Sequence, residues 1–251
     1  MNSLYQLPRP IIFAHRGACA YAPENTLAAF KLAEEVGAPA VELDVKLSLD
    51  GALVVIHDAC VDRTTGAKGL VNQMNWADLR QLDAGLFFSE AFKGEKIPLL
   101  EEVFALLGTR LLINIELTNY ASPKDALVEK TAALVTRCGM QDHVMFSSFS
   151  PINLLKARGL LPDVPVGLLS LQGVEGVWAR SFLARWFFPA IIHPFHSDAT
   201  QAFIQREHRR NRRVNVWTVN DPVEMKRLFK AKVDGIFTDD PALAKHVLEE
   251  G

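Results

Sequence analysis

Imidazole, guanidinium and carboxylate groups occur at the ends of apolar runs in this sequence. His15 and Arg16 follow "PIIFA", His57 closes "LVVIHD", and Glu116 lies near the end of "LLINIEL". A strand this apolar belongs inside a sheet, so a charged group at its tip is expected to face solvent, a partner or a ligand. Together these residue types can transfer protons and bind charged ligands.

A second set of charged residues lies within one apolar run, "AVELDV". Glu42 and Asp44 are two residues apart, so in a strand they share a face, with Cα atoms about 6.5–7 Å apart. If Glu116 reaches the same place, three carboxylates repel one another unless a cation holds them. Hard oxygen ligands without thiolates favour one divalent cation, Mg²⁺ or Ca²⁺, over Zn²⁺. Taken singly, the carboxylates could instead cap a helix or pair with lysines, and a lone histidine at a strand end could be structural.

The elements that must position these residues alternate along the chain. Strands are predicted at 10–14, 40–45, 111–117, 143–148, 165–171, 190–194, 213–219 and 235–239, and helices at 25–36, 99–107, 124–138, 150–159, 174–187, 199–210, 222–231 and 240–249. This alternation favours parallel βαβ units that close into a (β/α)8 TIM barrel, in which chemistry lies at the C-terminal ends of the strands. A doubly wound open sheet is the alternative. Residues 53–98 read as a small insertion after strand 2.

Length and composition agree with a soluble globular protein that forms one domain over residues 1–251. Hydrophobic residues make up 49% of the chain and charged residues 22%, and no Pro/Gly/Ser-rich linker divides it. The net charge of −2 gives no general attraction to nucleic acid. We expect no membrane insertion and no signal peptide. The three scattered cysteines indicate reduced thiols and a cytoplasmic protein. The sequence leaves open whether the protein forms a homo-oligomer.

A series of motifs resembles those of the glycerophosphodiester phosphodiesterases of the cytosolic bacterial type. The sequence contains, in the order and spacing of that family, "HRG", "PENTLAAF", "ELDVKLSLDG", "VVIHD", "DRTTG", "LDAG", "IPLLEEV", "NIEL", "VWTVN" and "VDGIFTDDP". The resemblance extends from about residue 10 to residue 248. It implies a TIM barrel with a small insertion after strand 2, in agreement with the pattern of elements.

The resemblance also implies an activity, the metal-dependent hydrolysis of glycerophosphodiesters to an alcohol and glycerol 3-phosphate. It assigns acid/base catalysis to His15 and His57, the divalent cation to Glu42, Asp44 and Glu116, and substrate contacts to Arg16 at the phosphate and Trp217 at the pocket wall. The substrate is then a small-molecule glycerophosphodiester. The alternatives are a phospholipase D-like or cyclising lyase on the same barrel, and a catalytically inactive binding protein.

One position departs from the pattern of this family. Many members have a lysine two residues after the glutamate of strand 3, where this chain has Thr118 in "IELTNY". Lys46 continues the face of Glu42 and Asp44 and could reach the same phosphate. A solvated surface lysine is the alternative that we favour.

Two further segments have patterns that suggest structural roles. "HRRNRR" at 208–213 places four arginines beside the end of a helix, where we expect a solvated, structural role away from the chemistry. "VWARSFLARWFF" at 177–188 spaces Trp178, Phe182 and Trp186 four residues apart, and we expect this stripe to pack on the barrel. An oligomer contact or a pocket lid is the alternative for the second segment.

Overall fold

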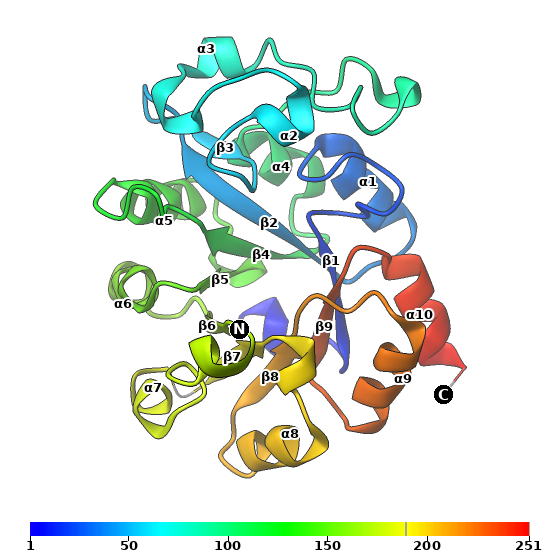
Figure 1. The fold of residues 1–251 in the computed structure, drawn as a ribbon. Helices are drawn as coiled ribbons and strands as arrows, with labels where there is room; N and C mark the ends of the chain where they lie inside the picture. The colour runs from blue at the N-terminus through cyan, green and yellow to red at the C-terminus, as the bar shows by residue number, and fades with distance from the viewer. Residues whose placement is uncertain (189, 251) are drawn as a thin grey trace.

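Eight parallel strands close into a ring surrounded by helices (Figure 1). The structure is a computed structural model that describes residues 1–188 and 190–250, so residues 189 and 251 of the expected domain lie outside it. The first strand pairs in parallel with both the second and the last strand of the ring, which closes the sheet. The predicted TIM barrel is therefore confirmed, and the open sheet is excluded.

The strands and helices follow the order that the sequence predicts. The barrel strands are β1 (Ile11–His15), β2 (Ala40–Leu47), β4 (Leu112–Leu117), β5 (Val144–Ser148), β6 (Val166–Ser170), β7 (Ile191–Pro194), β8 (Arg213–Val216) and β9 (Gly235–Thr238). The main helices are α1 (Leu27–Glu35), α4 (Leu100–Leu107), α5 (Leu127–Arg137), α6 (Pro151–Leu160), α7 (Phe182–Phe187), α8 (Gln201–His208), α9 (Pro222–Lys230) and α10 (Pro241–Glu249). Within the described residues, none of the helices has the length and apolarity needed to cross a membrane.

Residues 53–98 extend the barrel beyond β2, in the upper part of Figure 1. The short strand β3 (Leu53–Val55) pairs antiparallel with the end of β2, and α2 (Asp62–Thr65) and α3 (Trp76–Leu79) follow. The segment has a small hydrophobic cluster of its own, which contains Val61, Val71 and Leu79 among others. It therefore holds His57, just after β3, beside the barrel.

Helix α7 differs from the expectation for residues 174–187. A short 3₁₀ turn covers 173–176, and the helix starts only after Ser181, whose side chain accepts a hydrogen bond from the Ala184 backbone. The buried residues are Ala184 and Phe188, four apart, which leaves Phe182 58% exposed and Trp186 75% exposed. The prediction of a stripe packed on the barrel was wrong because this helix is short and presents a different face.

The arginine-rich segment 208–213 has the structural contacts that were expected, but it is only partly solvated, so that part of the prediction was wrong. Arg212 is fully buried beside Glu207, with 3.4 Å between Nη1 and Oε2. Arg213, the first residue of β8, donates from Nη1 to the carbonyl of Leu4 over 2.8 Å. Leu4 packs against inward-facing barrel residues such as Phe13 and Phe237. Arg213 thus holds the N-terminal segment against the end of the barrel where the strands begin, whereas Arg212 pairs with α8.

Candidate active site

The turn after β1 places His15 and Arg16 at the barrel mouth. Arg16 has φ 56° and Gly17 has φ 85°, both in the left-handed region, so the chain reverses sharply after the strand. A Cβ on Gly17 would lie 2.6 Å from the backbone carbon of Ala29 in α1. Only glycine fits this close approach. The "HRG" motif therefore reflects the need for a tight turn as well as for two cationic side chains.

The structure brings Glu42, Asp44 and Glu116 together at the C-terminal ends of β2 and β4. Asp44 pairs in register with Glu116, and one carboxylate oxygen from each of the three residues lies within 4.8 Å of the others. Glu42 and Asp44 are 3% and 1% exposed. Burial, together with the negative charge of Asp44, raises the pKa of both Glu42 and Glu116. Such a cluster needs positive charge to hold all three groups ionised.

Neighbouring donors fix the orientation of these carboxylates. The Arg16 backbone N–H donates to Glu42 Oε2 over 3.0 Å, and Asn25 Nδ2 donates to Asp44 Oδ2 over 2.9 Å. Tyr120 Oη donates to Glu116 Oε1 over 2.9 Å. The Arg16 guanidinium lies beside the group, with Nε 3.5 Å from Asp44 Oδ2 and without a hydrogen-bond partner of its own. This arrangement leaves cationic N–H groups next to an acidic cluster.

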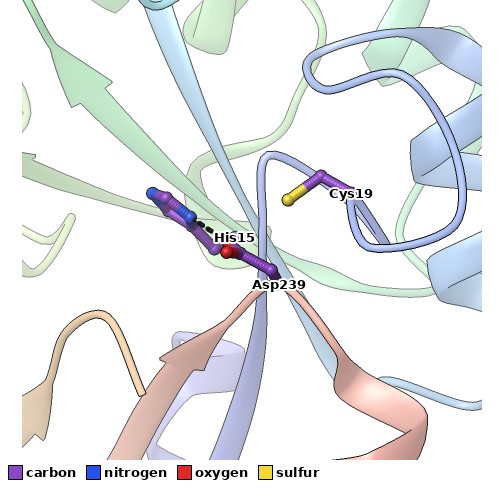
Figure 2. A group of neighbouring side chains, drawn as sticks. All are labelled: His15, Cys19 and Asp239. Atoms are coloured by element: carbon purple, nitrogen blue, oxygen red, sulfur yellow. Dashed lines mark hydrogen bonds and ion pairs between the residues drawn. The ribbon is translucent and has the colours of Figure 1, made fainter. Parts of the chain in front are cut away.

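Each of the two candidate imidazoles has its Nδ1 on an aspartate. His15 Nδ1 is 2.6 Å from Asp239 Oδ1 (Figure 2), and His57 Nδ1 is 2.7 Å from Asp58 Oδ1. Asn220 Nδ2 donates to the second oxygen of Asp239 over 2.6 Å. An aspartate that accepts from Nδ1 leaves Nε2 as the nitrogen that exchanges a proton with a ligand. For His15, Nε2 lies 4.0 Å from Glu42 Oε2 and therefore faces the carboxylate cluster.

A chain of ion pairs links His57 to the turn that carries His15. Arg63 donates from Nε to Asp58 over 2.7 Å and from Nη1 to Glu24 over 2.6 Å. Glu24 accepts in turn from Arg16 Nη1 over 2.9 Å. The hydrogen bond from Arg63 lowers the pKa of Asp58 to about 2, against the opposing effect of burial. The extension after β2 is thus tied to the first barrel strand through charges.

One pocket at the mouth collects most of the predicted site residues. It is lined by His15, Arg16, Glu42, His57, Asn114, Glu116, Ser147, Phe149, Leu169, Trp217, Thr218 and Phe237. Trp217 forms its aromatic wall, edge-on to Phe149 with ring centroids 5.4 Å apart. The residue lies just after β8, and its Nε1 donates to the His193 carbonyl over 2.8 Å, which fixes the plane of the ring. The pocket combines cationic, acidic and apolar walls.

Lys46 is partly buried and lines a neighbouring pocket together with Thr118. Its ammonium group donates to the carbonyl and to Oγ1 of Thr118, over 2.8 and 2.9 Å. Burial lowers the pKa of Lys46, although the charges of Asp44 and Glu116 oppose that change. The expectation of a solvated lysine was therefore wrong. β2 pairs in parallel with β4, and the Lys46 side chain contacts Thr118, the residue that departs from the family pattern.

Several residues of the site were not singled out from the sequence. Asp239 and Asn220 orient His15, Asp58 and Arg63 lie behind His57, and Tyr120 contacts Glu116. Asp239 directly follows β9, so the rule that placed His15 at a strand end could have identified it. Tyr120 lies in a loop without a distinctive pattern, and its contact becomes visible only in the folded chain.

Comparisons with known proteins identify the family of this chain. The model of the glycerophosphoryl diester phosphodiesterase family matches residues 15–243. A glycerophosphodiester phosphodiesterase of Caldanaerobacter subterraneus subsp. tengcongensis is 36% identical, over 97% of this chain and 99% of its own. A second, from Bacillus altitudinis, is 35% identical over 95% of this chain and 98% of its own.

A solved structure shares both the fold and the length of this chain. The phosphodiesterase of Oleispira antarctica, solved in complex with the product sn-glycerol-3-phosphate, superposes with a TM-score of 0.86 at 29% identity and covers 99% of this chain and 100% of its own. The family match and the full-length relatives confirm the resemblance drawn from the motifs. The chain belongs to the glycerophosphoryl diester phosphodiesterase family and is an enzyme of that class.

Proposed function

We propose that this enzyme hydrolyses glycerophosphodiesters to an alcohol and glycerol 3-phosphate, using a divalent cation and two histidines. The observation that carries the proposal is the single pocket in which His15, His57 and Arg16 face the carboxylates of Glu42 and Glu116. The complex of the Oleispira antarctica phosphodiesterase with sn-glycerol-3-phosphate supports the assignment of the glycerol phosphate moiety.

The donor set fits a divalent cation. Glu42, Asp44 and Glu116 offer carboxylate oxygens within 4.8 Å of one another. Within the described residues, the one lysine or arginine that forms a salt bridge with them is Arg16, whose Nε lies 3.5 Å from Asp44 Oδ2. Oxygen donors alone favour Mg²⁺ or Ca²⁺. When bound, such an ion offsets the charge that develops on the phosphoryl oxygens.

The imidazoles carry the protons. With Nδ1 of each ring held by an aspartate, Nε2 of one histidine takes a proton from the attacking oxygen and Nε2 of the other gives a proton to the leaving alkoxide. The leaving group is strongly basic, so its departure requires this proton. His15 and His57 extend from different segments and face the same pocket, which allows one to act on each side of the phosphorus.

The remaining walls of the pocket recognise the substrate. The Arg16 guanidinium lines the pocket and can donate to a phosphoryl oxygen. Trp217 and Phe149 give an apolar surface for the glycerol carbons. The three free cysteines agree with the expectation of a reducing, cytoplasmic environment.

Turnover of glycerophosphocholine tests this proposal. The purified enzyme is assayed with Mg²⁺ or Ca²⁺, after EDTA, and after readdition of the ion, and the phosphorus-containing products are identified by ³¹P NMR. We expect glycerol 3-phosphate, loss of activity with EDTA and recovery with the ion. A cyclic phosphate as the final product would instead favour the lyase, and turnover that survives exhaustive chelation contradicts a catalytic ion.

A Glu42→Gln variant gives a second arm to this experiment. It removes one ligand charge while it keeps the volume of the side chain, so we expect it to require far more cation for the same turnover. The exposed Glu90→Gln serves as the control, because Glu90 pairs only with Lys93 on the surface. Equal cation requirements for the two variants would contradict the assignment of Glu42.

A further inference from the structure

A second group of metal-ligating side chains lies at the rim of the same mouth. Cys19, His15 and Asp239 each offer a ligand atom, and these atoms lie within 4.8 Å of one another. In Figure 2 the thiol of Cys19 extends from the turn after β1 toward the paired side chains of His15 and Asp239. All three residues are partly buried. The proposed hydrolysis uses His15 but gives Cys19 no role.

The backbone fixes the distance between the segments that carry this group. The Ala20 backbone N–H donates to the carbonyl of Asp239 over 3.0 Å, and the Ala18 N–H donates to the carbonyl of Ala29 over 3.0 Å. Hydrogen bonds on both sides of Cys19 therefore hold its turn against the residue after β9 and against α1. The thiol does not depend on a mobile loop to reach the imidazole.

The donor chemistry of this group differs from that of the carboxylate cluster. Imidazole nitrogen, thiolate sulfur and one carboxylate oxygen are the ligands that Zn²⁺ prefers, with a fourth position left to water, whereas Mg²⁺ and Ca²⁺ prefer oxygen alone. The thiol loses its proton to solvent when the ion binds, and the thiolate and Asp239 together balance the charge of the ion.

We propose that His15, Cys19 and Asp239 form a second metal site, which binds Zn²⁺ and inhibits the enzyme. The inhibition rests on the proposed function, because it acts through the role of His15, whereas the binding does not. The ion takes Nδ1 of His15 and so displaces the hydrogen bond to Asp239. A neutral ring with a metal on Nδ1 carries its proton on Nε2, so Nε2 can no longer act as a proton acceptor.

The geometry requires only side-chain rotation. A tetrahedral ion with bonds of about 2.0–2.3 Å separates its ligand atoms by about 3.3–3.8 Å. His15 Nδ1 and Asp239 Oδ1 are 2.6 Å apart, so they must separate by about 1 Å, within the reach of small χ changes. The Cys19 sulfur lies within 4.8 Å of the other ligand atoms, so it must approach by about 1 Å at most. The backbone hydrogen bonds on either side stay in place during these movements.

Binding is tested with Co²⁺ as a spectroscopic probe in the enzyme saturated with Mg²⁺. A thiolate–Co²⁺ bond gives a charge-transfer absorption in the near ultraviolet, and this readout is independent of turnover. We expect the band in the wild-type enzyme and in the double variant Cys60→Ser/Cys138→Ser, which keeps Cys19 alone. We expect no band in Cys19→Ser, and Zn²⁺ should abolish the band where it occurs. A band that persists in Cys19→Ser, or no band in the wild type, overturns the site.

Inhibition is tested with the same proteins. Cys19→Ser should keep the basal activity, while the Zn²⁺ concentration for half inhibition should rise at least about tenfold, as the loss of a ligand predicts. The double variant should be inhibited like the wild type. Equal inhibition of Cys19→Ser and wild type means that Zn²⁺ acts at the carboxylate cluster, which overturns the inhibitory role. An enzyme without phosphodiesterase activity refutes the proposed function, while the Co²⁺ band still decides the metal site.

Discussion

Histidines at the rim of this barrel and inside it have opposite surroundings. His15 and His57 at the mouth each direct Nδ1 to an aspartate, at 2.6 and 2.7 Å. His193 on β7 is fully buried, its ring lies 5.0 Å from that of Phe237, and its Nδ1 has no partner. Burial, with a smaller effect of Arg212, lowers the pKa of His193 to about 3. The interior histidine is therefore neutral, and it is a packing residue.

The comparison shows that the surroundings of an imidazole decide what it can do. An aspartate on Nδ1 stabilises the protonated ring and selects the nitrogen that faces a ligand. An apolar surrounding without a carboxylate excludes the protonated ring altogether. In the sequence, each of the three histidines lies at the end of an apolar run. Only the folded chain therefore distinguishes the two rim histidines from the interior one.

Removal of a rim imidazole is the strongest test of this contrast. We expect His15→Ala and His57→Ala each to lower kcat by about 10²–10⁴-fold, because a positioned acid or base is lost. Thermal unfolding should change little, since both side chains are partly exposed. Steady-state kinetics and a melting curve measure the two effects. Full activity in either variant contradicts the acid/base assignment, and a large fall in Tm favours a structural role.

The aspartates behind the rim histidines should matter less than the rings themselves. Asp239→Asn and Asp58→Asn each remove the charge that orients an imidazole, and we expect kcat to fall by roughly 10–10³-fold. The fall should appear in kcat and leave KM little changed, because the ring is no longer oriented for proton transfer while the substrate contacts remain. The surface Asp62→Asn, which removes an ion pair with Lys68, is the control. An unchanged kcat in both variants argues that the aspartates only pack.

The interior histidine should affect stability and leave catalysis unchanged. Its folded pKa of about 3 lies below the value of about 6.5 in the unfolded chain, so between these values the unfolded state binds a proton that the folded state does not. The associated stability is present above pH 6.5 and is lost as the pH falls toward 3, by up to about 1.4 kcal/mol per pH unit.

His193→Gln removes this titration, so its free energy of unfolding should depend less on pH than that of the wild type. Denaturant unfolding at pH 7 and pH 5 measures the difference. The kcat of the variant at pH 7 should equal that of the wild type. Equal pH slopes in the two proteins would show that the interior histidine does not resist protonation.

The ring of strands and the three carboxylates were predictable because they follow local rules. Short apolar runs that alternate with helical patterns predicted the strands, and the strand-end rule predicted that Glu42, Asp44 and Glu116 meet. The orientation of α7 and the burial of Arg212 were not predictable. The first depends on where a short helix begins, and the second on the buried Glu207 of α8, with which Arg212 pairs.

Lys46 was predictable in one respect and not in another. Its place on β2 followed from the sequence, but its hydrogen-bond partner did not. The face shared with Glu42 and Asp44 suggested a phosphate ligand, but the ammonium group donates to Thr118 instead, over 2.8 and 2.9 Å. Removal of the Lys46 side chain should have the smallest effect on catalysis of the substitutions considered.

We expect Lys46→Met to change kcat/KM by less than about threefold, because in the proposed site Arg16 and a cation already face the phosphate and a single charge needs no third cation. The lost hydrogen bonds should lower the free energy of unfolding by about 1 kcal/mol.

The double variant Lys46→Met/Thr118→Lys is the matched comparison, since it returns a lysine to the position that other family members use. Denaturant unfolding and kcat/KM with glycerophosphocholine measure the two effects. A fall in kcat/KM of tenfold or more in Lys46→Met, reversed in the double variant, would mean that Lys46 leaves Thr118 to bind phosphate when substrate enters. An effect on stability alone assigns Lys46 to the joint between β2 and the loop after β4, and leaves Arg16 as the cationic side chain at the phosphate.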